Sequence, residues 1–223
     1  MIPPASYNAG VKQVLNQGIH VHGKQPRKRR RPQQARAIKK YNEILDASAR
    51  VLENLGFQQA TMSEIHLESG HPYATIYQYF SNKEDVYLAW LERFMDEAIF
   101  ELAHRVAKTP GTDLTQRIEL GVHYSLQQII THRHTLEKLL NGMSLVTSRM
   151  VEHLEDKSRR LIQQAFARQL QASPDDALFE QLLTATRAGN GYWLMLMLNP
   201  RHDIHLERET RNVTSLIRAL LAN

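Results

Sequence analysis

Helical periodicity runs through almost the whole chain from residue 35 onward, and it constrains the fold more than any other feature. Apolar residues recur at spacings of three and four, which places them on one face of an α-helix. The first such segment shows the pattern most clearly, with Tyr41, Leu45 and Leu52 on its apolar face, and Gly56 marks its end. No segment has the strict alternation of a half-buried strand. The sequence therefore predicts an all-α protein.

Glycine, proline and helix-capping sequences divide this pattern into about nine helices. Thr61 with Glu64 forms a capping-box sequence, and Ser81 with Glu84 forms a second one. The expected helical ranges are 35–56, 61–70, 72–80, 81–108, 114–131, 133–141, 145–171, 174–198 and 204–221. The first three helices suit a compact tri-helical unit over residues 35–82. The long helix that follows joins this unit to a larger C-terminal helical bundle over residues 83–223.

Charge is distributed unevenly along the chain. Residues 1–42 contain ten Lys or Arg and no acid, whereas the remaining residues carry 18 basic and 23 acidic side chains. The first 34 residues are also rich in proline, so we interpret them as a disordered basic arm. The run at its centre comprises Arg27, Lys28, Arg29, Arg30 and Arg31. Such an arm indicates a polyanionic partner, although a merely solvated tail has the same composition.

Composition excludes several classes of protein. The chain has no cysteine, which rules out disulfides, thiol nucleophiles and cysteine zinc sites, and fits a reducing compartment. No signal peptide is visible, and the longest apolar run is too short to span a bilayer. We therefore expect a cytoplasmic protein that does not insert into a membrane.

Four aromatic residues crowd the segment "SGHPYATIYQYFSNKED" at residues 69–85. On a helical wheel, Ile76 and Phe80 share the inward side, and Ala74 and Gln78 point the opposite way. The two flanks carry Tyr73 with Tyr77 and Thr75 with Tyr79. A helix with this pattern suits a DNA groove, because the flanking hydroxyls reach phosphates while Ala74 and Gln78 face the bases. The alternative is that Tyr77 and Tyr79 pack against neighbouring helices.

The segment "ILDASARVLENLGFQQATMSEIHLESGHPYATIYQYFSNKEDVYLAWL" at 44–91 resembles the DNA-binding domain of TetR-type transcriptional regulators. The resemblance implies a helix-turn-helix domain at 35–82 that binds a double-stranded DNA operator. It implies phosphate contacts from Thr61, Thr75, Tyr77, Tyr79 and Lys83, and base contacts from Tyr73, Ala74 and Gln78. Three features depart from the family pattern: Pro72 replaces a small hydroxyl residue, His71 replaces an aliphatic one, and His66-Leu67 replaces an alanine-bearing pair.

The resemblance also implies a homodimer and a small-molecule effector, and so a repressor that the effector releases from DNA. Two apolar stripes near the C-terminus offer a dimer surface, in which two helices from each subunit form a four-helix bundle. The stripes comprise Leu178, Leu182, Ala185, Gly189 and Trp193, then Leu206, Val213, Leu216 and Leu220. Alternatively, both stripes are buried within their own subunit. Candidate effector-pocket residues are His123, Tyr124, Met143, Phe166 and Trp193.

Three other functions fit parts of the sequence less well. The stretch "GIHVHGKQ" at 18–25 nearly matches the sequence of a phosphate-binding loop. However, Gln25 stands where that loop needs a Ser or Thr hydroxyl, and no strand precedes it. A di-iron bundle needs two Glu-x-x-His pairs on long helices, and the long helices expected here offer one, Glu101 with His104. We therefore predict no catalytic residues, no metal site and no cofactor. The remaining alternative is a helical protein that binds nucleic acid through the arm without sequence preference.

Overall fold

The computed structural model describes residues 32, 34–108, 113–142, 148–167, 170, 177–199 and 203–221. All of them belong to one compact unit that spans residues 31–223. The basic run at Arg27–Arg31 and the candidate pocket residue Met143 lie outside the described residues, so the predictions about them remain predictions.

The fold is all-α, as predicted, with nine helices in the ranges just given. Their bounds are α2 (Ala35–Gln59), α3 (Met62–Ser69), α4 (Tyr73–Tyr79), α5 (Lys83–Lys108), α6 (Leu114–Thr131), α7 (Arg133–Gly142), α8 (Ser148–Ala165), α10 (Ala177–Leu198) and α11 (Leu206–Leu221). No helix in the described part of the chain is long and apolar enough to cross a membrane.

Two glycines and one threonine set the limits of the first helices. Gly56 has a positive φ of 73° and puts a kink in α2, and the helix continues beyond it to Gln59. Thr61 precedes α3 and its Oγ1 accepts a hydrogen bond from the Glu64 amide at 3.2 Å. Gly70 ends α3 in the left-handed conformation with a φ of 67°, which a residue without a Cβ adopts at little cost. The predicted limits at Thr61 and Gly70 are confirmed.

The cap of α5 lies one residue later than predicted. The amide of Asp85 donates to Oδ1 of Asn82 at 2.8 Å, and the amide of Ser81 donates to Asp85 Oδ2 at 3.1 Å. The predicted pairing of Ser81 with Glu84 is therefore wrong. Asparagine caps a helix as well as serine does, and the sequence contains both residues side by side.

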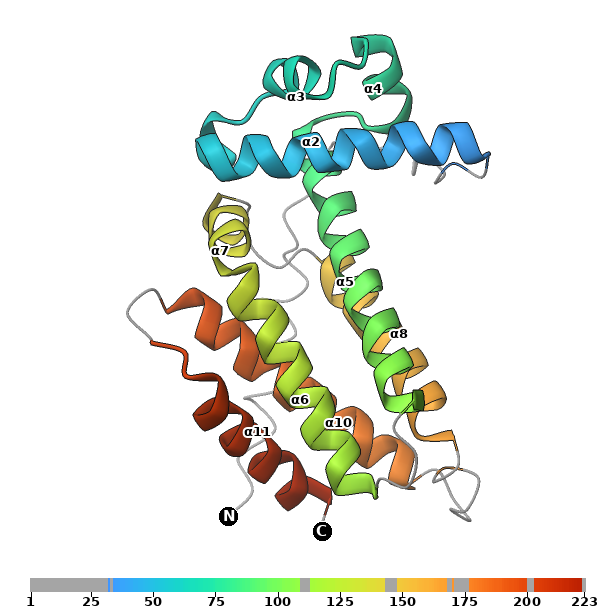
Figure 1. The fold of residues 1–223 in the computed structure, drawn as a ribbon, viewed down its shortest axis with the longest axis vertical. Helices are drawn as coiled ribbons and strands as arrows, with labels where there is room; N and C mark the ends of the chain where they lie inside the picture. Colours follow the sequence, from blue (N-terminus) through green and yellow to red (C-terminus); the bar gives the residue numbers. More distant parts are fainter. Residues whose placement is uncertain are drawn as a thin grey trace, which may run out of the picture. The chain divides into compact units, whose positions relative to one another are not determined.

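The core of the first three helices continues into α5 and α7. Ile44, Leu52, Ile65 and Ile76 are fully buried, and the same cluster includes Trp90 of α5 and Leu139 of α7. Figure 1 shows α5 running from beneath α2 into the C-terminal helices, with α7 ending against α2. The tri-helical unit therefore shares its core with the helices that carry the rest of the chain.

Phe57, near the end of α2, lies where α2, α5 and α7 meet. Its ring packs against that of Tyr87 with the centroids 5.5 Å apart. Gly142 approaches it so closely that an added Cβ would lie 2.2 Å from the Phe57 Cβ. Glycine at position 142 is thus required by the contact between α7 and α2.

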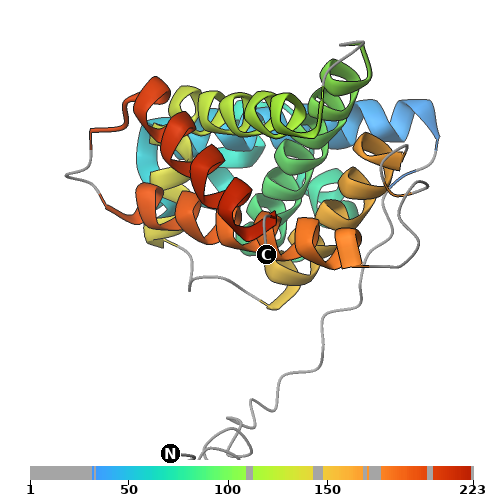
Figure 2. The same cartoon turned by 90° about the horizontal axis from the view of Figure 1, so that it is seen from below.

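The C-terminal helices form a second packed region. Helix α11 lies against α6 and α10, and α8 lies against α5 and α10 (Figures 1 and 2). The core between α6, α10 and α11 includes Ile118, Val122, Ala185 and Val213, all buried. These five helices surround the cavity described below.

Candidate nucleic-acid interface and ligand cavity

Helix α4 presents the faces that the wheel predicts. Ile76 is completely buried, whereas Ala74 and Gln78 are exposed. Tyr73 and Tyr77 retain 41% and 42% exposure, and their rings stack with the centroids 6.3 Å apart. The helix is therefore anchored by one side and offers small and amide side chains, bordered by two tyrosines, on the surface.

The other flank of α4 is more buried than predicted. Tyr79 is half-buried, and its ring meets that of Tyr41 edge-on with a centroid distance of 5.6 Å. The centroid of the Phe80 ring lies 5.0 Å from that of the Tyr41 ring. The sequence left open whether Tyr77 and Tyr79 pack against a neighbouring helix. In the structure Tyr79 does so, and Tyr77 stays on the surface. Thr75 is also half-buried.

Lys83 makes contacts that the sequence does not predict. Its Nζ donates to the carbonyl oxygens of Phe57 at 2.8 Å, Ala60 at 3.0 Å and Gln58 at 3.4 Å. The same atom lies 4.6 Å from the centroid of the Phe57 ring. An ammonium group has three hydrogens to donate, and these carbonyls take all of them. In this structure Lys83 therefore caps the end of α2, which leaves none of its hydrogens for the phosphate contact that the resemblance implies.

The turn before α4 contains two histidines whose role the sequence analysis missed. His66 Nδ1 lies 2.7 Å from the carbonyl oxygen of His71, and the His66 ring stacks on Tyr73 at a centroid distance of 4.2 Å. His71 Nε2 lies 2.9 Å from Oε2 of Glu43 on α2. The available signal was the departure from the family pattern at these two positions.

A cavity of about 250 Å³ lies among the C-terminal helices. Its wall is mainly apolar and is built from α5, α6, α8, α10 and α11, together with Phe166. Of the candidate pocket residues, Tyr124, Phe166 and Trp193 line it. His123 does not line it, because it lies off the face of α6 that carries Ile118 and Val122.

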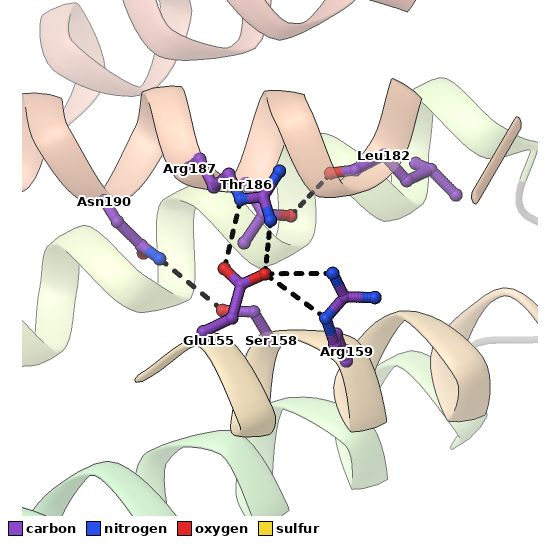
Figure 3. A network of polar contacts seen from close by, with 7 residues as sticks. All are labelled: Glu155, Ser158, Arg159, Leu182, Thr186, Arg187 and Asn190. Atoms are coloured by element: carbon purple, nitrogen blue, oxygen red, sulfur yellow. Dashed lines mark hydrogen bonds and ion pairs between the residues drawn. The ribbon is translucent and has the colours of Figure 1, made fainter. Parts of the chain in front are cut away.

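Polar groups interrupt the apolar wall where α8 meets α10. Ser158, Thr186 and Asn190 line the cavity there, and Ser158 is buried with 4% exposure. Nδ2 of Asn190 donates to the Ser158 hydroxyl at 3.5 Å, and the Thr186 hydroxyl donates to the Leu182 carbonyl at 2.8 Å (Figure 3). The cavity therefore combines a hydrocarbon-like wall with a short polar strip.

An ion-pair cluster spans α8 and α10 next to this strip. Glu155 on α8 accepts hydrogen bonds from the guanidinium of Arg187 on α10 and from Nε of Arg159 at 3.2 Å (Figure 3). The hydrogen bond from Arg187 is the largest cause that holds the pKa of the Glu155 carboxyl below its ordinary value. The cluster joins the two helices at the surface of the cavity wall.

The two predicted dimer stripes mostly serve the subunit's own packing, which is a correction. Leu182, Ala185 and Gly189 are buried and line the cavity with Trp193. Val213 is fully buried in the core that α11 forms with α6. The remaining residues are half-buried on these cores, except for Leu216, which is 41% exposed. The half-buried residues are Leu178, Leu206 and Leu220.

A different face of α10 is exposed. Met195 is 65% exposed, Thr184 and Gly191 are also exposed, and Ala188 is half-buried on the same side. A helical wheel identifies an apolar stripe but not the helix that covers it. Here α6, α8 and α11 of the same chain cover the stripe that the sequence assigned to a partner.

Comparisons with known proteins place the N-terminal helices in a family. Residues 44–90 match the family described as bacterial regulatory proteins, tetR family. The matched residues comprise most of α2, all of α3 and α4, and the start of α5.

Two Bacillus subtilis proteins are similar in sequence over part of the chain. The fatty acid metabolism regulator protein is 29% identical over 87 residues, which are 39% of this chain and 45% of that protein. The uncharacterized HTH-type transcriptional regulator YfiR is 34% identical over 64 residues, 29% of this chain and 31% of that protein. The chain thus matches less than half the length of each of these relatives.

Solved structures resemble the fold over most of its length. The fatty acid degradation regulator FadR from Bacillus halodurans has a TM-score of 0.51 at 21% identity, covering 80% of this chain and 94% of that one. A TetR-family regulator from Syntrophomonas wolfei has a TM-score of 0.61 at 16% identity, covering 83% and 96%. At these identities the likeness shows the fold.

Proposed function

Because residues 44–90 match the tetR family of bacterial regulatory proteins, we propose that this chain is a sequence-specific regulator in which α4 reads the major groove of a DNA operator. The observation that carries this proposal is the pair of exposed residues Ala74 and Gln78 on a helix whose opposite face is fully buried. Glutamine pairs bidentately with adenine, and alanine contacts the methyl group of thymine.

Residues around this pair hold the helix in register. Tyr77 is exposed beside Gln78, so its hydroxyl reaches the phosphate wall of the groove. Thr61 lies at the N-terminus of α3, where hydroxyls and free amides bind phosphate. Tyr73 borders the base-facing residues, and its ring is fixed by stacking. The basic arm adds phosphate contacts that do not depend on sequence.

We also propose that the regulator is a homodimer, because two copies of α4 then read the two halves of a palindromic operator. In this proposal the dimer surface is the exposed side of α10 around Gly191 and Met195, together with Leu216 of the adjacent helix α11, in place of the stripes expected from sequence. Small residues permit close approach of helices, and the two large apolar side chains supply area to bury.

The cavity is the proposed effector site, and its occupation releases the DNA. Its long apolar wall and short polar strip suit a molecule with a hydrocarbon chain and a polar head. Relatives described as a fatty acid metabolism regulator and a fatty acid degradation regulator support a fatty acyl compound. The protein then acts as a repressor that responds to such a compound.

Titration with straight-chain fatty acids of increasing length tests the effector proposal. The preferred operator duplex carries a fluorophore, and a fall in its anisotropy reports release. Gly189→Leu places a larger side chain at the cavity wall, where an added Cβ meets only the Trp193 ring at 3.9 Å. This variant should bind DNA but require more fatty acid for release.

Gln127→Leu, on an exposed position of α6, is the matched control. Release by the same concentration in all three proteins would contradict the location of the site. No release by any chain length would contradict the effector class and leave DNA recognition intact.

A further inference from the structure

Helix α4 begins without the side-chain cap that usually fixes the start of a short helix. Pro72 occupies the N-cap position and no side chain accepts from the first free amides. The Pro72 carbonyl accepts from the amides of Thr75 at 2.9 Å and Ile76 at 3.1 Å. Because the orientation of so short a helix depends on what holds its first turn, other contacts must position it.

His66 holds this first turn from the side of α3. Since a carbonyl oxygen only accepts, His66 Nδ1 must carry a hydrogen and donate it to the His71 carbonyl. The backbone carbonyl of His66 accepts from the Gly70 amide at 3.0 Å. Its ring stacks on Tyr73, which in turn stacks on Tyr77. One residue thus closes α3, holds the turn and fixes the aromatic border of the reading surface.

His71 holds the same turn from the side of α2. Its Nε2 donates to the carboxylate of Glu43, and its side chain is only 18% exposed. Its amide donates to the Ser69 hydroxyl at 3.3 Å. The residue immediately before Pro72 is therefore tied to the first helix of the unit.

We propose that His66 and His71 are positioning residues for DNA reading, which hold the first turn of α4 in place of the missing cap. The proposal rests on the proposed function of α4 as the groove-reading helix. His66 fixes the ring of Tyr73, and His71 fixes the start of the helix against α2. Operator preference then depends on two side chains that contact other protein groups.

Further charged residues of α2 and α3 form ion pairs. Lys39 lies 3.8 Å from Glu43 and shares its carboxylate with His71, which moderates the charge of that group. Arg50 of α2 pairs with Glu68 of α3 at 2.5 Å, which leaves their combined charge near zero. Glu43 is thus the carboxylate that His71 meets.

The experiment measures the affinity ratio between the selected operator duplex and its scramble, with the full-length protein. The ratio cancels the general attraction of a positively charged protein to DNA. His66→Ala should lower it about two- to tenfold, the range expected for one aromatic pair. His66→Phe keeps a ring on Tyr73 but loses the donor to the His71 carbonyl, and His71→Gln keeps a donor for Glu43.

We expect His71→Ala to lower the ratio as well, and His66→Phe and His71→Gln to retain more of it than the two alanine variants. The matched control is His104→Gln, since His104 stacks on Phe100 in α5, away from the turn. This control should keep the wild-type ratio. Circular dichroism confirms that every variant is folded.

Equal weakening of both duplexes by His66→Ala would overturn the proposal, because it would show a role in stability alone. A wild-type ratio in both His66→Ala and His71→Ala would also overturn it. If the wild type itself shows no preference for any duplex, the proposed function has failed and this proposal fails with it. The wild-type ratio separates these cases.

Discussion

Replacing Lys83 by methionine should lower the stability of the protein and leave the salt dependence of DNA binding unchanged. The substitution keeps the length of the side chain but removes the ammonium group that donates to three carbonyls at the end of α2. Hydrogen bonds from a charged donor contribute about 1.5–3 kcal/mol, and the cation over the Phe57 ring adds about 0.5–1 kcal/mol.

The expected loss in free energy of unfolding is therefore about 2–4 kcal/mol. In a protein of this size each kcal/mol lowers the Tm by about 2–4 °C, so a fall of about 4–16 °C should be visible by circular dichroism. Lys39→Met is the matched control, because the Lys39 side chain is 79% exposed and its ion pair with Glu43 is 3.8 Å long. That variant should keep the wild-type Tm.

The competing assignment is a phosphate contact from Lys83, which the family resemblance implies. Removing one phosphate contact lowers the slope of log K against log salt by about 0.9. An unchanged Tm together with a slope reduced by that amount would refute the capping role. A lower Tm with the wild-type slope would support it.

Four further predictions concern the reading helix, the arm, the dimer and the ion-pair cluster. Gln78→Ala should cost about 1–3 kcal/mol on the preferred duplex and little on its scramble, measured by anisotropy. Deleting residues 1–31 should lower the salt slope by about 0.9 for each phosphate that the arm neutralises, and an unchanged slope would identify a solvated tail. Leu216→Glu should shift the protein toward a monomer near 25.7 kDa in analytical ultracentrifugation, whereas an unchanged mass would place the dimer surface elsewhere. Arg187 depresses the pKa of the Glu155 carboxyl, so the ionised carboxylate stabilises the fold at pH values above the ordinary glutamate pKa of 4.5. This contribution is lost as the pH falls below that value. Glu155→Gln should therefore make the Tm less sensitive to pH between about 3 and 5.

Local sequence signals predicted the helices well. Thr61 and Gly70 act where expected, because a cap or a left-handed residue works through atoms only a few positions away. The inward placement of Ile76 also follows from the wheel alone, since its burial depends on the period of the helix. Features that depend on distant parts of the chain were harder to predict.

Lys83 and the C-terminal stripes show why. Lys83 reaches carbonyls about 25 residues earlier in the chain, and nothing near it in sequence announces them. Val213 lies on an apolar stripe that fits a partner subunit or a neighbouring helix equally well, and α6 of the same chain is the helix that covers it. His66 was visible as a departure from the family pattern, but its stacking on Tyr73 required the geometry of the turn.

Selection of bound sequences from a random DNA pool tests the central claim most directly, with anisotropy on the selected duplex and its scramble at two salt concentrations. The account predicts a palindromic site that is bound more tightly than its scramble at both salt concentrations. Gln78→Ala should reduce this preference, since Gln78 faces the bases. Enrichment of no sequence, with equal and salt-sensitive binding to both duplexes, would contradict the account and favour a sequence-independent nucleic-acid-binding protein.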